Sequence, residues 1–125
     1  MSGFRQPGNN KELINTTGTT LTIGPGDAGK VFANVGSAGN IAYTIQTAAN
    51  FRPGDQITIL SAAAGTVTVN FTAGQLVTFN NAAAGSVALS TSSEIIGGGF
   101  IFTCLSASKW HCLVLCEETQ TVTVA

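Results

Sequence analysis

The chain reads Ile41-Ala42-Tyr43-Thr44-Ile45 in its first half and Val67-Thr68-Val69-Asn70-Phe71 further on. In both stretches a large apolar residue alternates with a small or polar one. Because successive side chains of a strand point to opposite faces, this period of two predicts strands that bury one face. Val, Ile, Thr and Phe also suit a pleated, half-buried surface. Both stretches therefore predict β-structure.

The same alternation recurs along the chain between turn segments rich in Gly, Pro, Asn and Asp, such as 24–27, 52–55 and 97–99. No stretch shows a helical period bounded by caps. Strands at this spacing predict an all-β fold, a compact antiparallel β-sandwich or barrel-like domain. The predicted strands are 20–23, 30–35, 41–46, 56–60, 66–71, 76–79, 86–90, 95–105 and 110–116.

A chain of 125 residues is expected to form one domain. We place the β-sandwich at 20–116 and an extended N-terminal arm at 1–19, which has few large apolar residues. The arm is either a frayed terminus or a segment that becomes ordered on a neighbouring subunit. Residues 117–125 form a tail in which Thr and Val alternate, and this tail is expected to close a sheet edge in its own subunit or in another.

Charge is scarce in this sequence. Lys and Arg number 5 and Asp and Glu number 6, so that 9% of residues are charged, whereas roughly 25% is typical of a soluble domain. The net charge of -1 excludes the broad basic surface of a nucleic-acid-binding protein. The uncharged stretch 56–93 is broken by Gly, Thr and Asn, so we expect no membrane-spanning helix. Low charge and many small side chains instead favour association into a symmetric homo-oligomer.

The segment from Gly24 to Lys30 has the Gly-x4-Gly-Lys spacing of a phosphate-binding loop. Such a loop needs Ser or Thr next, to ligate magnesium, and then a helix whose amides hold the phosphate. Here Val31 follows, and the residues after it are predicted to form a strand. The segment is therefore predicted to be a structural turn.

Three cysteines, Cys104, Cys112 and Cys116, surround His111 in a predicted hairpin joined by residues 106–109. Pairing Leu105 with Trp110 would set Cys104 opposite His111 and would point Cys104 and Cys112 to opposite faces. A disulfide between them is then disfavoured. Their spacing matches no familiar zinc pattern, and isolated thiols usually pack as small core residues. We predict no catalytic residue, no metal site and no cofactor.

The stretch Thr20-Leu21-Thr22, followed by a strand that enters from Asp27-Ala28-Gly29-Lys30 and ends at Asn34, resembles small tailed-bacteriophage virion proteins. Ile41 to Ile45, the alanine-rich connection and the closing hairpin with Trp110 fit the same β-module, over residues 19–116. Similar modules occur in capsid decoration (cement) proteins and in fibre or spike proteins. The resemblance implies a compact β-sandwich, often trimeric, on the outside of a virus particle.

Within that group the small size favours a decoration protein over a fibre or tailspike. The expected function is non-enzymatic: after synthesis in the host cytoplasm, a homotrimer binds the major capsid protein on the outer surface of a phage head and stabilises the shell. The residues expected to contact the capsid are Phe4, Arg5, Leu13 and Ile14. Two alternatives remain: a tail-fibre, head-fibre or tailspike-associated component that binds a host glycan or an adaptor, and a small Cys/His enzyme.

Overall fold

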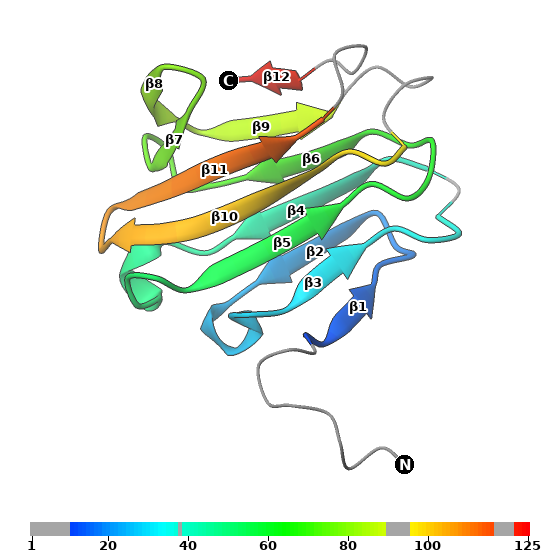
Figure 1. Cartoon of the computed structure of the whole chain (residues 1–125), viewed down its shortest axis with the longest axis horizontal. Coiled ribbons are helices and arrows are strands. Elements are labelled where there is room, and N and C mark those ends of the chain that lie inside the picture. The colour runs from blue at the N-terminus through cyan, green and yellow to red at the C-terminus, as the bar shows by residue number, and fades with distance from the viewer. Residues whose placement is uncertain (1–10, 38, 90–95, 117–121) are drawn as a thin grey trace.

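The computed structural model describes residues 11–37, 39–89, 96–116 and 122–125. These residues form two β-sheets packed face to face, together with two short 3₁₀ turns, η2 (Pro25–Asp27) and η3 (Ala48–Asn50) (Figure 1). The expectation of an all-β domain is confirmed. In the part of the chain that is described, no helix has the length and apolar character needed to span a membrane.

The larger sheet has seven strands, in the spatial order β1-β3-β5-β10-β11-β7-β8. They are β1 (Leu13–Asn15), β3 (Val31–Ala33), β5 (Gln56–Leu60), β10 (Gly99–Ser106), β11 (Lys109–Leu115), β7 (Leu76–Thr78) and β8 (Asn81–Ala84). The smaller sheet has five strands, in the order β12-β9-β6-β4-β2. They are β12 (Val122–Val124), β9 (Ser86–Leu89), β6 (Val67–Asn70), β4 (Ile41–Ile45) and β2 (Thr20–Ile23).

The expected antiparallel arrangement is wrong for much of the molecule, because both sheets are mixed. From β1 to β6 the chain crosses to the other sheet after every strand, and neighbours within a sheet are alternate strands of the sequence that run in the same direction (Figure 1). Thus β1, β3 and β5 pair in parallel, as do β2, β4 and β6. Apolar and polar residues alternate in the same way in parallel and in antiparallel strands. Only the connections between strands distinguish parallel from antiparallel pairing.

The core lies between the two sheets and is rich in aromatic residues. Trp110 is fully buried, and its ring meets Phe51 edge-on with the centroids 4.7 Å apart. Phe71 packs in the same way against Phe102 at 4.9 Å. Tyr43 of the smaller sheet is also fully buried. Edge-to-face contacts of this kind add to the free energy gained from burying the rings, so these side chains tie the two sheets together.

Both ends of the described chain pair within the same molecule. Residues 13–15, which the sequence analysis assigned to an arm, form the edge strand β1 beside β3. Short strands escape a search for alternating residues, because three residues give too little pattern. Strand β12 of the tail closes the edge of the smaller sheet beside β9. The tail therefore pairs within its own subunit, which was one of the two arrangements expected from the sequence.

The register predicted for the β10–β11 hairpin is wrong by one residue. Cys104 pairs with Trp110 and Phe102 with Cys112, because an irregularity at Leu105 shifts the pairing before Ser106 meets Lys109. A slip of one residue moves side chains to the other face of a sheet. Cys104 and Cys112 therefore both point into the core, instead of to opposite faces, and both are free thiols.

Candidate functional site

Part of the outer face of the seven-stranded sheet is apolar. Two neighbouring rows of paired residues cross it from β1 to β11. The first row consists of Leu13, Val31, Thr58, Ile101 and Leu113, and the second of Asn15, Ala33, Leu60, Gly99 and Leu115. We call these two rows, without the polar Asn15 at the sheet edge, the apolar face. Leu13 is 59% exposed and Leu113 is 51% exposed, so the apolar face ends in two accessible leucines.

Gly99 keeps the apolar face flat at its centre. A Cβ atom at this position would lie 2.6 Å from the carbonyl oxygen of Ile59 and 2.9 Å from the Leu60 side chain. Only a residue without a side chain allows Leu60 to lie over the backbone here. The result is a level surface between Leu60 and Leu115, of the kind against which another sheet can pack.

The charged side chains among the described residues lie outside the apolar face. They occur in turns or at strand ends, at Lys11, Glu12, Asp27, Lys30, Arg52, Asp55 and Lys109. Lys30 is held there by Asp27, whose carboxylate accepts a hydrogen bond from Nζ at 3.1 Å, and lies 3.9 Å from Glu12. The apolar face therefore offers burial of apolar surface and no charge to a partner.

The outer face of the five-stranded sheet has a different chemistry. Its paired rows are Thr20, Ala42, Thr68, Ala88 and Thr123, and then Thr22, Thr44, Asn70 and Ser86. We call these rows the threonine face. Hydroxyl and amide groups can hydrogen-bond to water, whereas leucine side chains cannot. The threonine face therefore tolerates solvent without a partner.

A second surface feature is the tip of the β7–β8 hairpin. The two residues of its turn, Phe79 and Asn80, have φ of 46° and 60°, the signature of a type I′ turn. Such turns favour Asn and Gly, and a phenylalanine in this region of backbone space is strained. The Phe79 ring is also 60% exposed. The fold thus holds an aromatic ring in solvent at a position that local preferences oppose.

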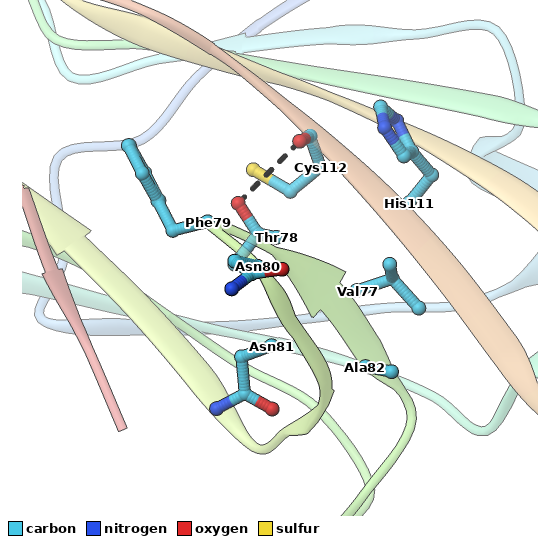
Figure 2. A pocket seen from close by; sticks show the side chains of 8 residues that line it. All are labelled: Val77, Thr78, Phe79, Asn80, Asn81, Ala82, His111 and Cys112. Carbon is cyan, nitrogen blue, oxygen red and sulfur yellow. Dashed lines mark hydrogen bonds between the residues drawn. The ribbon is translucent and has the colours of Figure 1, made fainter.

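Two shallow depressions flank the Phe79 ring. One has a volume of about 320 Å³ and extends to Asn81 and His111, and the other, of about 300 Å³, extends along β11 to Cys116. Figure 2 shows Phe79 and His111 on opposite sides of the first depression, with Cys112 between them, where the Thr78 hydroxyl donates a hydrogen bond to the Cys112 carbonyl at 3.5 Å. An exposed ring beside amide groups can bind a small polar ligand.

The Cys/His arrangement on which the alternative enzyme function depends is not assembled among the described residues. His111 is exposed on the outer face, whereas Cys104 and Cys112 face the core. Burial raises the pKa of the Cys112 thiol to about 12, and burial together with the Asp55 carboxylate raises the pKa of Cys104. Both groups are protonated thiols at neutral pH and are poor nucleophiles. Among the described residues, no three His, Cys, Asp or Glu side chains gather as a metal site would require.

The Gly24–Lys30 segment is a structural turn, as predicted. It contains a single 3₁₀ turn and then passes into β3, so no helix supplies amides for a phosphate. The Asp27 carboxylate accepts a hydrogen bond from the Gly24 amide at 3.1 Å. Gly29 has φ of 85°, and its amide donates to the Gln56 carbonyl at 2.7 Å. The last of these contacts fastens the turn to β5.

The residues predicted to contact a capsid fall in different places. Phe4 and Arg5 lie outside the described residues. Leu13 points outward at the edge of the apolar face, whereas Ile14 packs against the core of its own chain. The apolar face and Phe79 are surfaces that the sequence analysis did not identify. The outward position of Leu113 and Leu115 depends on the hairpin register, which the sequence pattern assigned incorrectly.

Sequence comparison does not identify this chain. No protein-family model matches it, and no curated protein is detectably similar to it.

Proposed function

We propose that this chain is a non-enzymatic structural protein of a virus particle: a decoration protein that binds the outer surface of a bacteriophage head as a homotrimer and stabilises the shell. The observation that carries the proposal is the contrast between the apolar face and the threonine face. One side of the sandwich suits burial against protein, and the other suits water.

The resemblance of residues 19–116 to phage virion modules supports the location on a virus particle. The sandwich itself supports a structural role, because a rigid two-layered domain can bridge neighbouring subunits by adding buried area. Each contact can be modest, since many copies act together on one shell. The buried thiols of Cys104 and Cys112 are protonated at neutral pH, which favours a structural protein over a Cys/His enzyme.

The direct test is the number of copies of this chain in purified particles from its source, measured by quantitative mass spectrometry against the major capsid protein. We expect hundreds of copies, in a fixed ratio to the capsid subunits. A handful of copies would instead indicate a component of a tail or fibre. Absence from the particle would exclude both locations.

Phe4, Arg5 and Leu13 are the proposed capsid contacts, and Ile14 supports β1 from the inside. Deleting residues 1–10 leaves β1 intact, so it tests the arm without removing a strand. The truncated protein should keep its fold and its oligomeric state but lose binding to capsids that lack the decoration protein. Binding equal to that of the full chain would exclude the arm.

The hairpin tip favours a second candidate function, a fibre-associated component that binds a host glycan. Phe79 offers an aromatic face for stacking, and Asn81 offers an amide beside it. A Phe79→Ser change should then abolish adsorption of the particle to its host, while incorporation into the particle is unchanged. Normal adsorption of the variant would exclude this candidate.

A further inference from the structure

We propose that the apolar face is covered by the same face of other copies of this chain. The inference deepens the proposed function and rests on it in taking the protein to act as an assembly. The contact is formed by Val31, Ile101, Leu113, Leu60 and Leu115, with Thr58 at the centre, and it leaves Leu13 at the outer end of the apolar face to the capsid.

The first argument comes from the comparison of the two outer faces. Both belong to one chain, and both lie on sheets with the same alternation of inward and outward side chains. The threonine face has hydroxyl groups at positions where the apolar face has leucine, isoleucine and valine. If both faces met water, the same composition would serve for both. The difference indicates that only the apolar face is buried in the assembled protein.

The second argument concerns the kind of partner. Complexes between different proteins commonly use complementary charges to set orientation and to exclude wrong partners. The two rows of the apolar face contain no acidic or basic residue. Interfaces between identical chains are the more apolar class and resemble a domain core cut in half. An uncharged surface is also compatible with itself, since no like charges meet when two copies approach.

The third argument is the size of the surface. Five neighbouring strands, β1 to β11, carry the apolar face. With strands about 4.8 Å apart and about 3.3 Å per residue, its two rows span three residues and cover roughly 24 Å by 10 Å. That area of about 240 Å² suits the dry centre of an interface that buries about 800 Å² on each partner, provided that a rim supplies the rest. A rim is present beside it, where Gln56, Thr103 and His111 form a polar row and the Gln56 amide donates to the Thr103 hydroxyl at 3.1 Å.

A partner's side chains need a level surface to pack against, and Gly99 with the overlying Leu60 provides one within the apolar face. In a trimer the three apolar faces surround the common axis, so that each meets both neighbours at an angle. The threonine face then points away from the axis, toward solvent.

The experiment compares two single substitutions, one on each face, in the full chain. Leu113→Glu places a charge on the apolar face, and Thr44→Glu places the same charge at an exposed strand position of the threonine face. Oligomeric state is measured by sedimentation over a wide range of protein concentration, and folding by circular dichroism and thermal unfolding. We expect the unchanged protein and Thr44→Glu to remain oligomeric, and Leu113→Glu to dissociate with an affinity reduced about 100-fold or more.

Three results would overturn the inference: an unchanged protein that is monomeric throughout, a Leu113→Glu variant that stays associated, or equal dissociation of both variants. If Leu113→Glu does not fold, Leu60→Glu with Thr22→Glu as its control makes the same comparison on other strands. The outcome does not depend on the particle. The protein can self-associate and yet be absent from phage heads, and this result would refute the proposed function but not the interface.

Discussion

The two outer faces of this sandwich differ although the same folding rule produces both. On each sheet, outward side chains alternate with the core residues, and strand pairing aligns them in rows. On the five-stranded sheet the rows contain Thr, Ser, Asn and Ala, whereas on the seven-stranded sheet the large residues of the apolar face are Leu, Ile and Val, around Thr58. The core requires only that inward residues be apolar. The outward residues are free to vary, so their chemistry reports the environment of each face in the assembled protein.

The largest expected effect is on the pH dependence of stability, and it comes from Cys112 on the inner side of β11. The pKa of Cys112 is raised from an ordinary value near 9 to about 12, because the thiolate would be buried. Between pH 9 and pH 12 the unfolded chain loses this proton and the folded chain keeps it, so the free energy of unfolding falls as pH rises, by about 1.4 kcal/mol per pH unit for this group. Below pH 9 the group contributes no slope.

Denaturant unfolding at a series of pH values measures this slope. A Cys112→Ala variant should be less stable at pH 7 but should lose less stability between pH 9 and pH 12. The exposed Cys116 provides the matched control, since Cys116→Ala removes a thiol without opening a cavity in the core. Equal slopes in the native protein and the Cys112→Ala variant would contradict the burial of this thiol.

The next effect concerns the flat centre of the apolar face. Gly99→Ala forces a methyl group against the Ile59 carbonyl and should lower the free energy of unfolding by about 2–3 kcal/mol. Ala88→Val, which enlarges an outward residue of the threonine face, should change it by less than about 0.5 kcal/mol. Chemical denaturation of both variants gives the comparison. A Gly99→Ala variant as stable as the native protein would show that the backbone has room for a methyl group at this position.

A third change tests whether hydroxyl groups keep the threonine face free of partners. The double variant Thr22→Leu, Thr44→Leu makes two paired positions apolar. Burying a leucine is worth roughly 1.5–3 kcal/mol, so two such faces per subunit should drive growth beyond a closed oligomer. Light scattering should show larger particles, whereas Thr22→Ser with Thr44→Ser should behave as the native protein does. An unchanged particle size for the leucine variant would show that the hydroxyl groups of the threonine face do not keep it free of partners.

The smallest effect concerns the hairpin tip, which belongs to neither face. Asn tolerates positive φ better than Phe does, so Phe79→Asn should raise the free energy of unfolding by about 1 kcal/mol. Thermal unfolding measures the gain. Asn81→Ala, just outside the turn, is a control that should not stabilise, since it removes the hydrogen bond from the Ala83 amide to the Asn81 side chain. A destabilised Phe79→Asn variant would show that the ring contributes packing that outweighs its strain.

Much of the fold was predictable from local pattern. The strands 20–23 and 56–60 were placed with correct bounds, and 41–46 was one residue too long. Strand β8, Asn81–Ala84, was missed, because three alanines give neither alternation nor β-propensity. The predicted turn at 52–55 is present, and the Asp55 carboxylate caps it by accepting a hydrogen bond from the Arg52 amide at 2.9 Å.

The candidate interaction surface was less predictable, because it depends on which strands are neighbours. Leu13, Ile101 and Leu113 are far apart in the sequence, and they form one row only through pairings across four ladders. The bulge at Leu105 added a further obstacle, since it moved every residue of β11 by one position relative to the simplest hairpin. Phe79 is an ordinary apolar residue in the sequence, and only its backbone angle and its exposure distinguish it.

The sequence by itself determined that this protein is an all-β domain with little charge, because alternation, turn residues and composition act through neighbours in the chain. The tertiary structure alone decided that its sheets are mixed, that both buried cysteines share one face, and that the leucines gather on one side of the sandwich. Those features arise where the chain crosses between sheets. Crossing sets strand direction and register through contacts between distant residues, which no local pattern encodes.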